Sequence, residues 1–98
     1  MLERQYQAKL IDKIHHLFPG CVILKNDTSY RQGIPDLTIL FKNTWAVLEV
    51  KADAKSPSQP NQEYYVELLH KMSFSAFIYP ENEEEVLNGL QRAFQPYW

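Results

Sequence analysis

The feature that most constrains the fold is a pair of apolar runs separated by a very short polar segment. The runs cover residues 36–41 and 45–51, and Lys42-Asn43-Thr44 connects them. Both runs are rich in β-branched, aromatic and aliphatic residues, and a connection of this length predicts a β-hairpin. Because the second run is apolar at positions on both of its faces, we expect helices to cover both sides of the sheet that contains it.

Three charged residues occupy one end of this hairpin. Asp36 opens the first run, and Glu49 and Lys51 close the second. Side chains alternate across a strand, so Glu49 and Lys51 project from the same face, and the hairpin returns Asp36 beside them. The segment Gly33-Ile34-Pro35 fixes the backbone before Asp36, because proline locks its own φ and keeps the preceding residue extended.

Charged groups are costly to place in apolar surroundings without partners. For two adjacent carboxylates, the simplest partner is a divalent metal ion. The spacing alone is common, and the alternative interpretation is a surface hairpin with a solvated Glu-Lys pair. The apolar second run and the rigid Gly-Ile-Pro segment favour a site.

The composition indicates one globular domain over residues 1–98. The chain is 45% hydrophobic and has no apolar run of membrane-spanning length, so we expect one modest core and no membrane partner. The first residues lack the charged-then-apolar order of a signal peptide. The single cysteine, Cys21, lies in an apolar run, which predicts a buried structural thiol and a cytoplasmic location.

The net charge of −2 is unevenly divided. Residues 1–80 hold nine Lys/Arg and eight Asp/Glu, whereas residues 81–98 hold one Arg and four Glu. A bound metal ion would also neutralise part of the charge of Glu3, Asp36 and Glu49. The body is then mildly basic, which predicts weak and salt-sensitive binding to phosphates.

Hydrophobic periodicity predicts the elements around the hairpin. Ser58 is expected to cap the second helix, with Pro60 inside its first turn, and the acids at 81–85 are expected in the first turn of the third. The predicted apolar stripe of the second helix is Tyr64, Tyr65, Leu68, Leu69 and Met72. The predicted order is a helix from Leu2 to Phe18, a strand at 21–25, a loop at 26–33, the hairpin, a loop at 52–59, a helix at 60–72, a strand at 75–79 and a helix at 81–94.

This αβββαβα order predicts a single α/β domain with a central four-stranded mixed sheet flanked by helices. The order and its motifs resemble the PD-(D/E)xK nuclease superfamily, with its restriction-endonuclease-like fold, and within it the stand-alone virus-type replication-repair nuclease (VRR-NUC) domains. The motifs are Gly33-Ile34-Pro35-Asp36-Leu37, Glu49-Val50-Lys51 and Pro60-Asn61-Gln62. Glu3 matches a glutamate that Holliday-junction resolvases of related fold carry near the start of the first helix.

The resemblance implies a Mg²⁺- or Mn²⁺-dependent DNA endonuclease that acts as a homodimer on branched DNA such as four-way junctions. It implies metal ligands at Asp36, Glu49 and the backbone carbonyl of Val50. Lys51 is expected to activate the attacking water or to stabilise developing charge. Gln62 and Glu3 complete the implied catalytic set, with Gln59 as a second candidate for the glutamine. Two departures are a short loop before Gly33 and the lack of an extra domain to direct the chain to one DNA structure.

Candidate phosphate contacts surround the predicted site, and Arg31 and Lys55 are preferred because their loops flank it. The set also includes Lys25, Lys42, Ser56, Ser29 and Tyr30. His15-His16 does not predict a zinc site, because adjacent helix positions point apart. Exposed aromatic residues at Trp45, Tyr97 and Trp98 would suit a dimer contact or packing over the sheet.

Three other functions remain open from the sequence. One is a flap, single-strand or nicking nuclease with the same site. Another is a non-catalytic nucleic-acid-binding module, and the third is a protein partner that uses its acidic last helix. The complete Asp-Glu-Lys set favours catalysis. We expect such a protein in the cytoplasm of a bacterium or of a virus-infected host cell.

Overall fold

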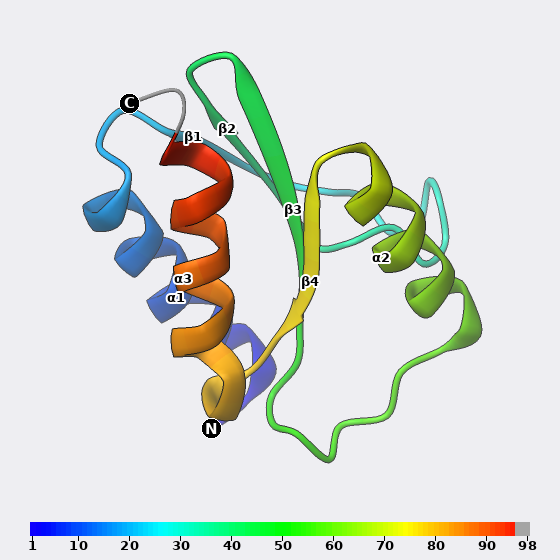
Figure 1. The fold of residues 1–98 in the computed structure, drawn as a ribbon. Coiled ribbons are helices and arrows are strands. Elements are labelled where there is room, and N and C mark those ends of the chain that lie inside the picture. The colour runs from blue at the N-terminus through cyan, green and yellow to red at the C-terminus, as the bar shows by residue number, and fades with distance from the viewer. Residues whose placement is uncertain (96–98) are drawn as a thin grey trace.

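The fold is that of a computed structural model, which describes residues 1–95 (Figure 1). Tyr97 and Trp98, two of the predicted dimer contacts, lie outside the described residues. The elements are α1 (Glu3–Leu17), β1 (Val22–Lys25), β2 (Leu37–Phe41), β3 (Thr44–Val50), α2 (Pro60–Met72), β4 (Phe74–Ile78), the 3₁₀ turn η1 (Pro80–Asn82) and α3 (Glu83–Phe94).

The four strands form one mixed sheet in the order β1-β2-β3-β4. β1 and β3 each pair with β2 in antiparallel fashion, and β4 pairs with β3 in parallel. The parallel pair is possible because α2 forms the crossover between β3 and β4. The predicted α/β class and element order are therefore confirmed.

One face of the sheet packs against α1 and α3, which lie side by side on the same side of the strands (Figure 1). Phe18, Phe41 and Phe94 form an aromatic cluster there, with ring centroids 5.1–5.6 Å apart. Both helices supply buried side chains at three- and four-residue spacing, as their sequences predict. Those side chains are Tyr6, Leu10 and Ile14 in α1, and Val86, Leu87, Leu90 and Phe94 in α3.

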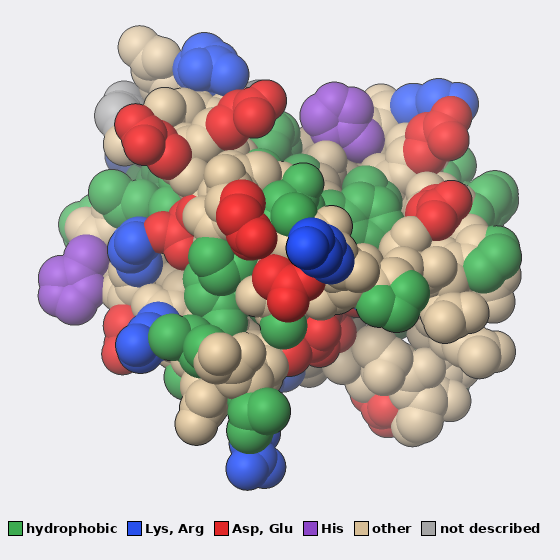
Figure 2. Space-filling model, turned by 90° about the horizontal axis from the view of Figure 1, so that it is seen from below, with side chains coloured by type: hydrophobic (Ala, Val, Ile, Leu, Met, Phe, Trp, Pro, Cys, Tyr) green, Lys and Arg blue, Asp and Glu red, His purple; other side chains and the backbone are tan. Residues whose placement is uncertain are grey.

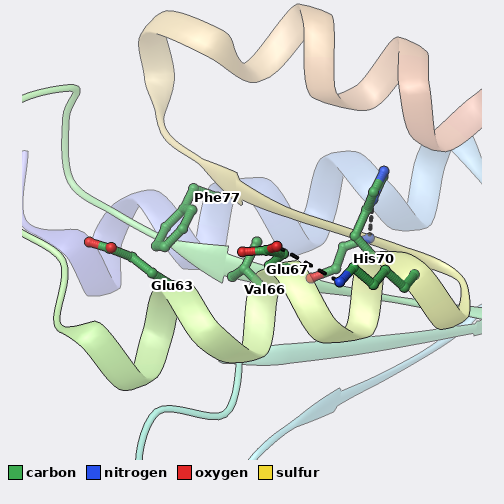
Figure 3. Close-up of a pocket in the computed structure, with 7 residues that line it drawn as sticks. Glu63, Val66, Glu67, His70 and Phe77 are labelled. Atoms are coloured by element: carbon green, nitrogen blue, oxygen red, sulfur yellow. Dashed lines mark hydrogen bonds and ion pairs between the residues drawn. The ribbon is translucent and has the colours of Figure 1, made fainter.

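The opposite face carries α2 (Figure 1). None of its residues is fully buried. The predicted stripe is wrong at two positions, since Tyr64 is 60% and Met72 is 64% exposed. A hollow of 430 Å³ between α2 and β4, drawn in Figure 3, leaves the buried hydroxyl of Ser75 without a hydrogen-bond partner. The helix therefore covers the sheet with half-buried side chains along its length, among them Tyr65, Leu68 and Leu69.

The hairpin turn is one residue shorter than predicted. Thr44 already belongs to β3 and pairs with Phe41, so the turn consists of Lys42 and Asn43. Lys42 has a φ of 54°, as two-residue hairpin turns require at a central position.

The cap of α2 also differs from the prediction. Gln59, not Ser58, is the N-cap residue, and Pro60 occupies the first helical position. The hydroxyl of Ser58 instead donates to the carboxylate of Glu63. Proline forces the preceding residue into an extended conformation, which makes that residue, rather than the one before it, the boundary of the helix.

Two predicted details at the other helix starts are wrong. Leu2 precedes α1 and is 57% exposed. Glu81 lies in η1, so the acids at the start of α3 begin with Glu83. Glu83 accepts hydrogen bonds from Tyr6 and Lys13 and so ties α3 to α1. Among the helices of the described residues, none combines the length and the apolar character needed to cross a membrane.

Candidate active site

Asp36 stands immediately before β2 and is tied to the end of β3. Its Oδ2 accepts a hydrogen bond of 2.9 Å from the backbone N–H of Val50. The side chain of Asn26 holds this strand start from the other side by donating to the carbonyl of Pro35 at 2.8 Å and to Thr38 Oγ1 at 2.9 Å. The backbone N–H of Asn26 also donates to the carbonyl of Asp36. Asn26 was not identified from the sequence, because an asparagine after a strand signals only a turn.

Glu49 is the most deeply buried acid of the cluster, with 3% of the residue exposed. It lies on the face of β3 that α2 covers. Its Oε2 accepts from Gln62 Nε2 at 3.1 Å and lies 3.7 Å from Lys51 Nζ. Its Oε1 is buried and accepts no hydrogen bond from an N–H or hydroxyl group of the described residues, while the carboxyl groups of Glu49 and Asp36 lie close enough to share a proton. Two carboxyl groups at one buried position can be held together by such a proton or by a cation that replaces it.

Lys51 follows Glu49 at the end of β3 and is also buried, with 8% of the residue exposed. Its ammonium donates to Gln62 Oε1 at 2.8 Å and to the carbonyl of Pro57 at 3.1 Å. Its backbone N–H donates to the carbonyl of Ile78, which extends the ladder between β3 and β4 by one residue. The side chain is therefore fixed in position.

Gln62 joins the acid and the ammonium from the first turn of α2. Its amide donates to Glu49 while its Oε1 accepts from Lys51 and from the backbone N–H of Gln59. Between the two candidate glutamines, the structure brings the side chain of Gln62 to the cluster. Gln59 contributes its backbone N–H, which locks the rotamer of Gln62.

The electrostatics of the cluster reflect its burial. Burial raises the pKa of Glu49 to about 8, and the negative charge of Asp36 adds to the rise while Lys51 opposes it. Burial also raises the pKa of Asp36, against the Val50 N–H and Lys51, which lower it. Glu3 is exposed at the start of α1, yet partial burial and the charge of Asp36 raise its pKa. Glu3 therefore lies close enough to belong to the electrostatic cluster.

The donor set fits a small hard cation better than a soft one. Carboxylate oxygens with several positions left for water and phosphate are what Mg²⁺ prefers. Oε1 of Glu49 and the remaining oxygen of Asp36 are the atoms that could hold it. Among residues 1–95, no three His, Cys, Asp or Glu side chains are grouped so that they could hold a metal by themselves. An ion at Asp36 and Glu49 would therefore need water and substrate oxygens to complete its coordination.

Glu49→Gln is expected to stabilise the metal-free protein in alkaline solution. In wild type the pKa rises from 4.5 in the unfolded chain to about 8 in the folded one. Folding therefore favours the protonated form, and this stability is lost as the pH rises through that window. We expect the variant to gain about 2 kcal/mol in free energy of unfolding near pH 8 and nothing near pH 4. Urea denaturation with a chelator present measures this, and equal gains at both pH values would contradict it.

The candidate phosphate contacts are distributed unevenly around this cluster. Lys25 ends β1 opposite Leu37 and so lies near Asp36. Arg31 is exposed and donates to the hydroxyl of Tyr65 at 3.2 Å, which holds its loop against α2. Lys42 is not brought to the site, because it sits at the opposite end of β2, 5.5 Å from the ring centroid of Phe41.

The loop after β3 carries the remaining two candidates. Lys55 is exposed, and Ser56 is half-buried and hydrogen-bonded to Asp53 within the loop. Figure 2 views the molecule from the end where α1 begins and where this loop runs; acidic side chains gather near the centre of that face with single basic ones between them. A polyanion approaching this end would need a cation to offset the acids.

Comparisons with protein-family models, with curated proteins and with solved structures find no match to this chain. These comparisons assign no family to the chain.

Proposed function

We propose that the chain is a metal-dependent DNA endonuclease of the PD-(D/E)xK type, related to VRR-NUC domains, which hydrolyses phosphodiester bonds. The observation that carries this proposal is the buried arrangement at the end of β3. There, Glu49 and Asp36 bring two carboxyl groups together, and Gln62 holds Glu49 beside the ammonium of Lys51. A divalent cation would relieve the repulsion between two carboxylates that share one site.

Each residue of the cluster has a part in this chemistry. Asp36 and Glu49 would hold Mg²⁺ or Mn²⁺, with the carbonyl of Val50 as a third oxygen. When bound, such an ion supplies a Lewis acid for the phosphoryl oxygens and for the attacking water. Lys51 orients that water or stabilises the charge that develops on the phosphate. Gln62 is a positioning residue, since it holds both Lys51 and Glu49 in their rotamers.

We further propose that the substrate is branched DNA and that the active form is a homodimer. β1 is the edge strand of the sheet, and its Val22 and Leu24 are 51% and 46% exposed. Apolar side chains on an open sheet edge are commonly covered by a partner. Two identical sites related by a twofold axis could cut paired strands of a junction symmetrically. The buried free thiol of Cys21 suits a reducing compartment such as the cytoplasm.

The direct experiment incubates wild-type protein with four-way-junction, flap, duplex and single-stranded DNA, each with Mg²⁺, Mn²⁺ or a chelator. We expect metal-dependent cutting that is fastest on the branched substrates. Cutting of flaps or single strands alone would contradict the four-way-junction substrate and support a flap or single-strand nuclease with the same site. Binding without cutting in any metal would contradict the proposal in favour of a non-catalytic module. Light scattering during size-exclusion chromatography tests the dimer independently.

Gln62→Ala is expected to lower the cleavage rate by roughly 10- to 100-fold, the usual cost of removing a residue that orients a ligand. The substitution removes the hydrogen bonds that the Gln62 side chain forms with Lys51 and with Glu49. Gln91→Ala on α3 is the matched control, because that residue lies on the other side of the sheet from the cluster. The loss should appear in kcat rather than KM, and an unchanged kcat would remove Gln62 from the mechanism.

A further inference from the structure

A cleft adjoins the candidate active site and shares one wall with it. The cleft has a volume of 480 Å³ and lies between the loop after β1 and the first turn of α2. The shared wall is Gln62, whose amide faces Glu49 and Lys51. The lining residues are Thr28, Ser29, Gln32, Gly33, Gln59, Pro60, Asn61 and Gln62. A hollow of this size is within the range of ligand sites, roughly 300–1,000 Å³.

The lining of this cleft is polar but carries no charge. Amide and hydroxyl side chains dominate it, and no Asp, Glu, Lys or Arg takes part. Neutral hydroxyl and amide side chains and the N-terminus of a helix can contact a phosphate, but cationic side chains supply most of the affinity for the backbone, and none lines this cleft. Amide side chains also match the paired donors and acceptors on the edge of a nucleobase. The lining can therefore offer hydrogen bonds to a base.

The loop also presents an aromatic ring beside the cleft. Tyr30 follows the lining residue Ser29 and is 85% exposed. An exposed tyrosine provides a face on which an unpaired base can stack. The contact between Arg31 and Tyr65 ties the residue after Tyr30 to α2, the helix whose first turn lines the cleft.

The hollow between α2 and β4 has the opposite character (Figure 3). Phe77 and Val66 contribute its apolar walls, and Glu63, Glu67 and Lys71 border it, with the Lys71 ammonium 3.9 Å from Glu67. Apolar walls offer few hydrogen-bond partners to the edge of a base. Of these two hollows beside α2, the neutral polar cleft is therefore the one suited to DNA.

We propose that the cleft binds an unpaired nucleobase next to the phosphate that is cut. The proposal extends the nuclease function and rests on it for the position of the phosphate. In a duplex, the pairing edge of each base is occupied, so only a nucleotide released from pairing can enter. The cleft thereby selects DNA with unpaired nucleotides at the cleavage position, as bulges, flaps and branches with an opened base pair provide.

The test compares three labelled DNA ligands by fluorescence anisotropy, with Ca²⁺ in place of Mg²⁺ to prevent cleavage. One is a duplex with a single bulged thymidine, one has an abasic residue at the bulge, and one is fully paired. The first two carry the same phosphates and differ only in the base. We expect the bulged thymidine to bind at least about tenfold more tightly than the abasic bulge.

The double variant Gln32→Ala/Asn61→Ala should reduce this preference to about twofold or less. Both side chains are exposed, and alanine keeps the Cβ of Asn61 that lies against Gly33, so the fold is expected to persist; circular dichroism verifies it. Asn88→Ala, an exposed position on α3, is the matched control and should keep the full preference.

Equal affinity of wild type for the two bulges, or an unchanged preference in the double variant, would overturn the cleft proposal. So would an absence of DNA binding. Cleavage of DNA in Mg²⁺ with no dependence of affinity on the base would contradict base binding in the cleft and support the nuclease function. Base-dependent affinity without cleavage would support base binding and contradict the nuclease function.

Discussion

Asp36→Asn is expected to reduce DNA cleavage by a factor on the order of a thousand while leaving the fold intact. The substitution removes the negative charge that would hold the metal ion. Lewis-acid stabilisation of a phosphoryl group amounts to several kcal/mol, and about 4 kcal/mol corresponds to three powers of ten in rate. The carboxamide oxygen of asparagine can still accept the hydrogen bond from Val50, so the end of the hairpin should stay in place.

The design separates loss of chemistry from loss of structure. Initial rates on a four-way junction in Mg²⁺ are compared with the thermal midpoint of each protein. Asp12→Asn is the matched control, because Asp12 is exposed on α1 and the substitution removes the same negative charge. A variant that cuts at more than about a tenth of the wild-type rate would contradict the assignment of Asp36 as a metal ligand. A large drop in thermal midpoint would assign Asp36 a structural role instead.

Gly33→Ala is expected to destabilise the protein by about 3 kcal/mol. Gly33 has a φ of 91°, and a Cβ placed there would lie 2.4 Å from the Cβ of Asn61 and 2.8 Å from its backbone carbonyl carbon. The left-handed backbone costs alanine about 1 kcal/mol. The overlap with the first turn of α2 adds about 2 kcal/mol, because helix backbone cannot yield as a flexible side chain does.

Gly20→Ala is a close control for this prediction. Gly20 has nearly the same φ, 89°, but no atom lies within 4 Å of the position that its Cβ would take. We expect it to cost about 1 kcal/mol, the backbone contribution alone. Urea denaturation of both variants measures the difference. Equal costs would mean that the close approach of the loop to α2 adds nothing. If the loop moves away instead, cleavage should fall with stability, because Gln62 sits next to Asn61.

The strands and helices were predictable because their periodicities are local. The three- and four-residue spacing in α1 and α3 marks the faces that are buried, apart from Leu2, which is exposed, and the apolar hairpin runs led to β2 and β3. The predicted apolar stripe of α2 was wrong at Tyr64 and Met72, which are exposed. Periodicity shows which face of a helix is apolar, but not how much of that face a neighbouring element covers.

The proximity of Asp36, Glu49 and Lys51 was also predictable, because a hairpin with a short turn has only one register that keeps its apolar face buried. The contacts that complete the site were not predictable in this way. Asn26 and Gln62 form hydrogen bonds with residues 10 or more positions away, and Gly33 lies against another element, the first turn of α2. The neutral cleft depends on the same long-range packing.

The sequence by itself determined the element order, the hairpin and the meeting of two acids with one lysine, because these follow from periods of two and 3.6 residues and from one short turn. Only the tertiary structure decided which glutamine reaches the lysine, how deeply Glu49 is buried, and where the polar cleft lies. These features arise where α2 and the loop after β1 pack against the end of the sheet. Contacts between such distant segments depend on the packing of the whole chain rather than on any local pattern.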